Sequence, residues 1–102
     1  MEKLVIVNPI AEAQPNTQRA RRFQPAPRPQ SLDGKRIGLY WNAKAGGDVA
    51  LARTREHLAR VFPSATFVDV FGDQGTHMRR ASPELLDRTA VLADAVVGTT
   101  AD

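Results

Sequence analysis

The sequence predicts an α/β fold in which three short strands alternate with two helices over residues 35–102. Three observations support this prediction. Apolar, β-rich runs recur at intervals that leave room for one helix, the segments between them show helical periodicity, and capping or breaking residues stand at the helix ends. Such alternation favours a parallel sheet with right-handed crossovers. We therefore expect the spatial order second, first, third strand, with one helix on each face, which is an incomplete Rossmann-like sheet.

The first 34 residues differ in composition, and we predict a short strand followed by an extended arm rich in proline and arginine. Residues 4–7 are an apolar, strand-like run that the turn signal Asn8-Pro9 ends. Residues 11–31 hold few large apolar side chains, and closely spaced prolines exclude both a helix and regular strand pairing. These prolines are Pro15, Pro25, Pro27 and Pro29.

The first strand and first helix follow directly after this arm. Residues 35–41 have the composition of a strand, and residues 42–47 form a glycine-containing loop. Asp48 is a favourable N-cap residue, so we predict a helix over residues 49–62 that Pro63 ends.

The second half of the predicted sheet repeats this order. Residues 65–71 alternate in the manner of a strand. Ser82 is the expected N-cap of the second helix, with Pro83 at its first position. Residues 95–98 are continuously apolar and predict the third strand.

A unit of this size buries too little surface to be stable alone, so we expect a partner. The third strand, which contains Val96 and Val97, would leave an apolar edge open to pairing. We expect a larger protein subunit that carries the remaining sheet and the reactive residues, giving a hetero-oligomer, or else a homo-oligomer. The alternative is a self-sufficient domain whose edge is covered by residues 4–7 and the arm.

Composition excludes several classes of chemistry. The chain has no cysteine, so it contains no disulfide, thiolate metal site or thiol nucleophile. We also expect no metal and no cofactor. No apolar run approaches the ~20 residues of a membrane span, and the first apolar run is too short for a signal peptide. We therefore expect a soluble, cytoplasmic protein.

The net charge of +3 is concentrated in the leading segment. Residues 1–36 hold seven basic and three acidic side chains, whereas residues 37–102 hold seven basic and eight acidic side chains. Because guanidinium groups pair well with carboxylates at interfaces, we interpret the arm as wrapping a partner protein. The single nearby aromatic residue and the lack of a recognised motif argue against nucleic-acid binding. The candidate interface residues are Arg19, Arg21, Arg22, Phe23, Arg28, Val96 and Val97.

The loops after the first two strands are candidate binding sites, because ligands of open α/β sheets bind at the carboxyl ends of the strands. The first loop offers a lysine, which could hold an anion or stabilise a thiolate, and two glycines that let backbone N–H groups approach a ligand. The second loop offers two arginines for an anionic substrate. The alternative for both loops is an ordinary solvated connection. The candidates are Asn42, Lys44, Gly46, Gly47, Arg79 and Arg80.

Several runs of the sequence resemble the UGSC family of bacterial proteins. These are SLDGKRIGL at residues 31–39, WNAK at residues 41–44, Asp48, and ADAVVGTTAD at residues 93–102. The early strand, Asn8-Pro9 and the Pro/Arg-rich approach match as well. The order and spacing of these pieces extend the resemblance over nearly the whole chain.

The resemblance implies a reactive motif that this sequence does not contain. The family is named for a selenocysteine (or cysteine)-Gly-Ser-Cys motif, which in its members directly follows the Asp that corresponds to Asp102. The sequence given stops at Asp102, and it has Thr99-Thr100-Ala101 where the family usually has glycine. Two explanations are open: a natural small subunit whose partner carries the motif, or a reading frame ended at a UGA codon that encodes selenocysteine.

The function implied by this resemblance is the small subunit or front half of a UGSC-like enzyme. Such a chain would complete the fold of a partner that performs thiol or selenol chemistry on a small molecule, without a catalytic residue of its own. Thr99, Thr100 and Asp102 would line the edge of the partner's reactive site, unless they form a frayed terminus. The rival hypothesis is a non-catalytic α/β binding or regulatory subunit.

Overall fold

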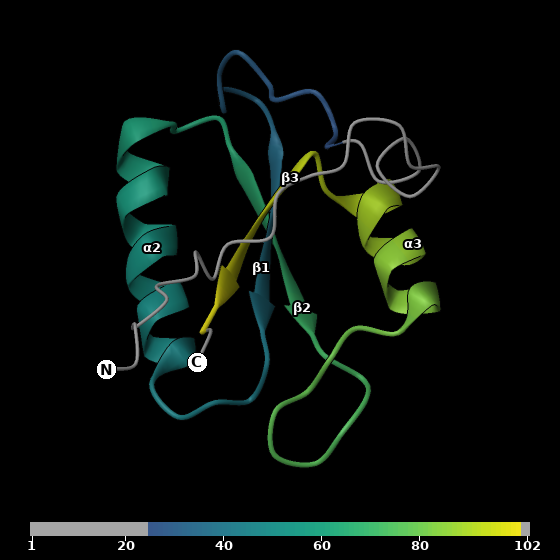
Figure 1. Cartoon of the computed structure of the whole chain (residues 1–102). Coiled ribbons are helices and arrows are strands. Elements are labelled where there is room, and N and C mark those ends of the chain that lie inside the picture. Colours follow the sequence, from purple (N-terminus) through teal and green to yellow (C-terminus); the bar gives the residue numbers. More distant parts are fainter. Residues whose placement is uncertain (1–24, 101–102) are drawn as a thin grey trace, which may run out of the picture.

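Three parallel strands lie between two helices in the computed structural model, which describes residues 25–100 (Figure 1). The elements are β1 (Arg36–Trp41), α2 (Gly47–Val61), β2 (Thr66–Phe71), α3 (Pro83–Leu92) and β3 (Ala95–Thr99). The strand order is β2-β1-β3, and α2 and α3 lie on opposite sides of the sheet. The predicted α/β class, the parallel sheet and the strand order are therefore confirmed.

The central strand β1 carries the core. Ile37 is 1% exposed and Leu39 is 3% exposed, and both pack with Leu51 of α2 on one face of the sheet. In the register of the sheet, Ile37 pairs with Phe67 of β2 and Ala95 of β3. Partly buried side chains surround this cluster: Leu32, Trp41, Leu58, Ala65, Phe67 and Val97.

The start of α2 differs from the sequence prediction. Asp48 is not the N-cap; the cap is Gly46, whose φ of 89° is left-handed, and it makes no side-chain capping bond. Asp48 lies in the first turn instead, where its charge is favourable to the helix dipole. Gly47, the first residue of the helix, lies so close to Trp41 and Thr99 that a Cβ would be 2.9 Å from each.

The start of α3 agrees with the prediction. The Ser82 Oγ accepts a hydrogen bond from the Leu85 N–H at 3.1 Å, and Pro83 occupies the first turn. The Asp73 carboxylate in turn accepts bonds from the Ser82 hydroxyl at 2.6 Å and from the Ser82 N–H at 2.8 Å. Those two bonds lower the pKa of Asp73 and keep it ionised.

An ion pair ties the beginning of β1 to the beginning of β3. The Asp94 carboxylate accepts bonds from the Arg36 backbone N–H at 2.8 Å, from Nε at 3.2 Å and from Nη2 at 3.0 Å. Arg36 also donates through Nη1 to the Val91 carbonyl at 2.9 Å. These bonds from Arg36 lower the pKa of Asp94 to about 2.

The Arg36–Asp94 pair predicts a stability loss in acid. An unfolded aspartate has a pKa of about 3.9. Because the folded value is lower, the contribution of the pair is complete above the unfolded value and is lost as the pH falls through about 2. We expect Asp94→Asn to be less stable than the wild type near neutral pH and to lose less stability on acidification. Urea denaturation at several pH values measures this.

Asp87→Asn, which changes an exposed carboxylate of α3, is the matched control and should follow the wild-type pH profile. Parallel profiles of wild type and Asp94→Asn would show that the pair contributes nothing to stability.

Several sequence predictions concern parts of the chain that the structure does not describe. The strand at residues 4–7 and most of the arm lie outside residues 25–100. Arg28 lies within that range, is exposed, and belongs to a segment without regular secondary structure. In residues 25–100, no helix is long and apolar enough to cross a membrane.

Candidate functional site

Asn42 directly follows β1 and joins it to the end of β3 and to the loop that follows β2. Its backbone N–H donates to the Thr99 carbonyl at 3.3 Å, and its carbonyl accepts from the Arg79 N–H at 2.7 Å. Its side-chain Nδ2 donates to the Thr100 carbonyl at 2.9 Å, and its Oδ1 accepts from the N–H groups of Thr100 at 3.3 Å and Lys44 at 3.2 Å. We call these five residues the Asn42 cluster. Asn42 therefore positions its neighbours, because its side-chain oxygen accepts two bonds and its Nδ2 donates one.

The loop between β1 and α2 is closed by bonds within itself and to β3. The Lys44 carbonyl accepts bonds from the Trp41 Nε1 at 2.8 Å and from the Gly47 N–H at 3.1 Å. The Thr99 hydroxyl donates to the Gly47 carbonyl at 3.0 Å. The Gly47 N–H, predicted to approach a ligand, is thus engaged inside the loop.

The loop between β2 and α3 is fixed against the same cluster. The Tyr40 hydroxyl donates to the Arg79 carbonyl at 2.6 Å. Gln74 and Arg80 exchange two backbone bonds, at 3.0 Å and 2.7 Å. Gly72 lies so close to the Arg79 carbonyl that no side chain fits there. The backbone of both arginines is therefore held in place.

The Tyr40 phenol stays protonated in this setting. Burial raises its pKa, and the nearby negative charge of Asp73 raises it further. The hydroxyl can thus donate its bond to Arg79 throughout the physiological pH range.

A hollow opens at this edge on the α3 side of the sheet, with a volume of about 670 Å³. Two arginines and no acidic residue are among the described residues that line it. The Arg79 guanidinium itself lies over the ring of Phe71, with its Cζ 5.0 Å from the ring centroid. The lining residues of this α3-side hollow are Tyr40, Asn42, Met78, Arg79, Arg80, Ala81 and Leu86.

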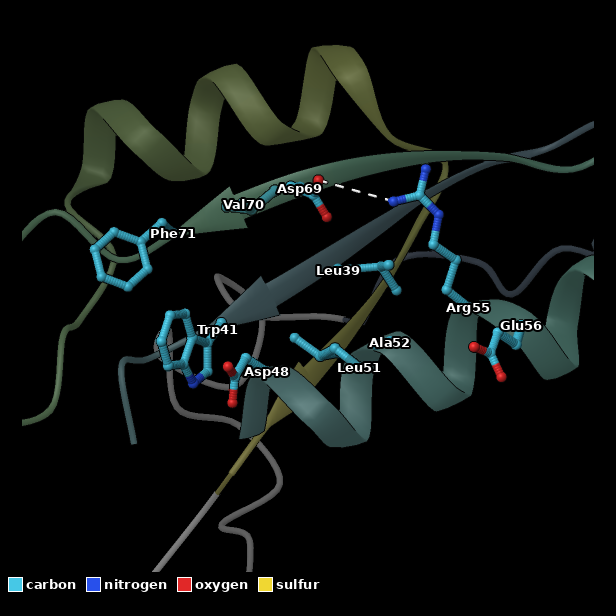
Figure 2. Close-up of a pocket in the computed structure, with 10 residues that line it drawn as sticks. All are labelled: Leu39, Trp41, Asp48, Leu51, Ala52, Arg55, Glu56, Asp69, Val70 and Phe71. Atoms are coloured by element: carbon cyan, nitrogen blue, oxygen red, sulfur yellow. Dashed lines mark ion pairs between the residues drawn. The ribbon is translucent and has the colours of Figure 1, made fainter. Parts of the chain in front are cut away.

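A second concavity, of about 420 Å³, lies between α2 and β2 and is the α2-side groove of Figure 2. The rings of Trp41 and Phe71 form one end, with centroids 5.4 Å apart, and Arg55 pairs with Asp69 at 3.9 Å toward the other end. Asp48 and Glu56 also line it. Sequence reasoning missed this groove, because it forms where α2 packs mainly over β1 and β3 and reaches β2 through Arg55.

The structure brings together part of the predicted site. Asn42, Lys44, Arg79, Thr99 and Thr100 form one bonded cluster, with Arg80 beside it in the hollow. Asp102, Arg19, Arg21, Arg22 and Phe23 lie outside the described residues. Val96 is 53% exposed on the edge strand, whereas Val97 is half-buried against the core.

Across residues 25–100, no three histidine or acidic side chains come together in a metal-binding arrangement. The described edge carries the cationic residues Lys44, Arg79 and Arg80 together with the hydrogen bonds of the Asn42 cluster.

Comparison with protein families shows to which family the chain belongs. A family model described as the UGSC family matches residues 5–102. The chain belongs to the UGSC family. The resemblance read from the sequence is thereby confirmed over nearly the whole chain. Comparisons with curated proteins and with solved structures found no match.

In this UGSC chain, the matched range contains every residue of the Asn42 cluster and both concavities. The cluster brings Thr99 and Thr100 against the Lys44 loop.

Proposed function

We propose that this UGSC chain is the front half, or a small subunit, of an enzyme that uses thiol or selenol chemistry on a small molecule. The observation that supports this most is the Asn42 cluster, which holds Thr99 and Thr100 beside the Lys44 loop. The UGSC resemblance implies that, in family members, the Cys/Sec-Gly-Ser-Cys motif directly follows the Asp that corresponds to Asp102. The cluster would then fix the backbone that leads into the reactive residues.

The edge of the sheet at β3 is an argument for a partner that supplies the remaining strands. Among the described strands, β3 pairs with β1 alone, so no described strand covers its other edge. Val96 on this strand is 53% exposed, and α3 exposes Leu86, Val91 and Leu92. Further strands and a helix from a partner would cover these apolar groups, as both faces of a parallel sheet are normally covered.

Lys44 is the residue of this chain that we expect to act on the reactive thiol. Its backbone N–H and carbonyl make structural bonds of the loop, which hold Lys44 at the carboxyl end of β1. A nearby ammonium group stabilises a thiolate and lowers its pKa.

The test combines this chain with a UGSC polypeptide that carries the Cys-Gly-Ser-Cys motif. We expect the two to copurify, and we expect Lys44→Ala to raise the pKa of the reactive thiol by about one unit. The pH dependence of alkylation by iodoacetamide measures that pKa. Arg60→Ala, at the far end of α2, is the matched control and should leave it unchanged. Failure to copurify would refute the proposal, and an unchanged pKa would refute the role of Lys44.

A non-catalytic binding or regulatory subunit is the second candidate. One observation favours it: the amide of Asn42 and the hydroxyl of Thr99 are already bonded inside the chain. In that case the two polypeptides would copurify, and no variant at this edge would change the reactivity of the thiol.

A further inference from the structure

The α2-side groove lies toward the edge of the sheet that is opposite to β3. Its described lining residues come from β1, α2 and β2, and it reaches the carboxyl ends of β1 and β2 at Trp41 and Phe71. Ligands of open α/β sheets bind at the carboxyl ends of the strands. A partner that extends the sheet beyond β3 would leave this groove accessible.

The groove has an apolar floor and a fixed indole at its aromatic end. The buried side chains of Leu39 and Leu51 line it beside Trp41 (Figure 2). The Trp41 Nε1 donates to the Lys44 carbonyl at 2.8 Å, and Gly47 lies so close to the ring that a Cβ would be 2.9 Å from it. The indole is therefore held in place before a ligand binds, which lowers the entropic cost of binding.

Trp41, rather than Phe71, is the ring that is left for a cation from outside the chain. The Arg79 guanidinium already lies over Phe71, with its Cζ 5.0 Å from the ring centroid, and Arg79 is not among the described residues that line the groove. Trp41 is half-buried and lines the groove. Tryptophan is the aromatic side chain that attracts cations most strongly.

Acidic side chains outnumber basic ones along the groove. Its described lining holds three carboxylates, from Asp48, Glu56 and Asp69, and one guanidinium, from Arg55. Arg55 pairs with Asp69 at 3.9 Å, and Glu56 pairs with Arg53 at 3.4 Å. The lining therefore favours a positively charged ligand over a negatively charged one.

Asp48 is the carboxylate that is left for such a ligand. The ion pairs within residues 25–100 include Glu56 and Asp69 but not Asp48. Asp48 follows Gly47, the residue that packs against the indole, and Figure 2 shows its carboxylate at the same end of the groove as Trp41. An ammonium group at this end would meet the carboxylate and the indole together.

We propose that the α2-side groove binds a small primary amine whose body is an apolar ring. The ammonium group is held by the Asp48 carboxylate and the Trp41 indole, and the ring lies over Leu39 and Leu51. The volume of the groove, about 420 Å³, lies within the usual range for small-molecule sites. This binding requires neither a thiol nor a partner, so it goes beyond the proposed function and does not depend on it.

Trp41 is the only tryptophan of the chain and therefore reports on the groove directly. The full chain labelled with 5-fluorotryptophan gives one ¹⁹F NMR signal, and an unlabelled partner adds none. The main probe is phenethylammonium. Three further probes each lack one of its features: ethylammonium has no ring, 2-phenylethanol has no charge, and phenylacetate has the opposite charge.

We expect phenethylammonium to shift the Trp41 signal saturably. Ethylammonium and 2-phenylethanol should each bind at least threefold more weakly, and phenylacetate more weakly still, because each loses the apolar contact or the charge pairing. Asp48→Asn should weaken the binding of phenethylammonium about threefold, which is the usual scale for an exposed ion pair.

Glu84→Gln is the matched control. Glu84 is the second residue of α3 as Asp48 is the second residue of α2, so each substitution removes an acidic group from the first turn of a helix. This variant should bind phenethylammonium as the wild type does.

The proposal would be overturned by an affinity for ethylammonium, 2-phenylethanol or phenylacetate equal to that for phenethylammonium, or by an unchanged affinity in Asp48→Asn. The comparison of the four probes needs only the wild-type chain, so it remains decisive even where the variant does not fold.

Discussion

Replacing Gly47 with alanine is expected to destabilise the fold by about 1–3 kcal/mol, the usual cost of overpacking. A Cβ at this position would lie 2.9 Å from the Thr99 Oγ1 and 2.9 Å from the Trp41 indole. Neither neighbour can move freely, because the Thr99 hydroxyl bonds the Gly47 carbonyl and the Trp41 Nε1 bonds the Lys44 carbonyl. The strain therefore falls on the carboxyl edge of the sheet.

Gly98→Ala is the matched control for this variant. The added methyl group would lie 3.7 Å from the Tyr40 ring, which is an ordinary contact. Glycine also weakens a strand, so this variant should be neutral or slightly stabilising. Urea denaturation of the assembled protein compares the stabilities of the two variants. Equal destabilisation would mean that the close contacts of the added Cβ at Gly47 are not the cause of the loss.

Replacing Asn42 with alanine is expected to cost about 2–3 kcal/mol, since two to three hydrogen bonds at about 1 kcal/mol each are lost. The loss concerns the bonds to both backbone groups of Thr100 and to the Lys44 N–H. We expect the end of β3 to separate from the Lys44 loop. Hydrogen exchange should therefore quicken at the Lys44 and Thr100 amides far more than at Ile37 in the core.

Asn42→Asp serves as the graded variant. Its carboxylate keeps the acceptor for the Lys44 and Thr100 N–H groups, but it cannot donate to the Thr100 carbonyl. Its loss of stability should lie between wild type and alanine. A loss in Asn42→Ala no larger than that of Thr99→Val, which removes one hydroxyl bond, would contradict the central position of Asn42.

Local patterns were sufficient to predict the strands, their order and the start of α3. Ser82 and Pro83 are adjacent in sequence and act on the helix that directly follows them, so a local pattern is enough to predict where α3 begins. The start of α2 was mispredicted because its cap is Gly46 in a left-handed conformation, which makes no side-chain capping bond, whereas Asp48 lies inside the first turn.

The chemistry of the site depends on contacts that sequence patterns do not encode. Asn42 was predicted as a binding residue from its place after the first strand, and its bonds to Thr100 across the sheet were not foreseeable. The Arg36–Asp94 pair, 58 positions apart in sequence, was missed for the same reason. The α2-side groove depends on the lateral placement of a helix, which no periodicity specifies.

The central claim is that this UGSC chain requires further sheet alongside β3. Thermal melting of the purified chain, with its mass measured by light scattering during size-exclusion chromatography, tests this most directly. We predict self-association or a broad, non-cooperative transition for the chain alone, and a single cooperative transition once a motif-bearing UGSC polypeptide is bound. A monomer that unfolds alone in one sharp, cooperative transition would contradict the claim.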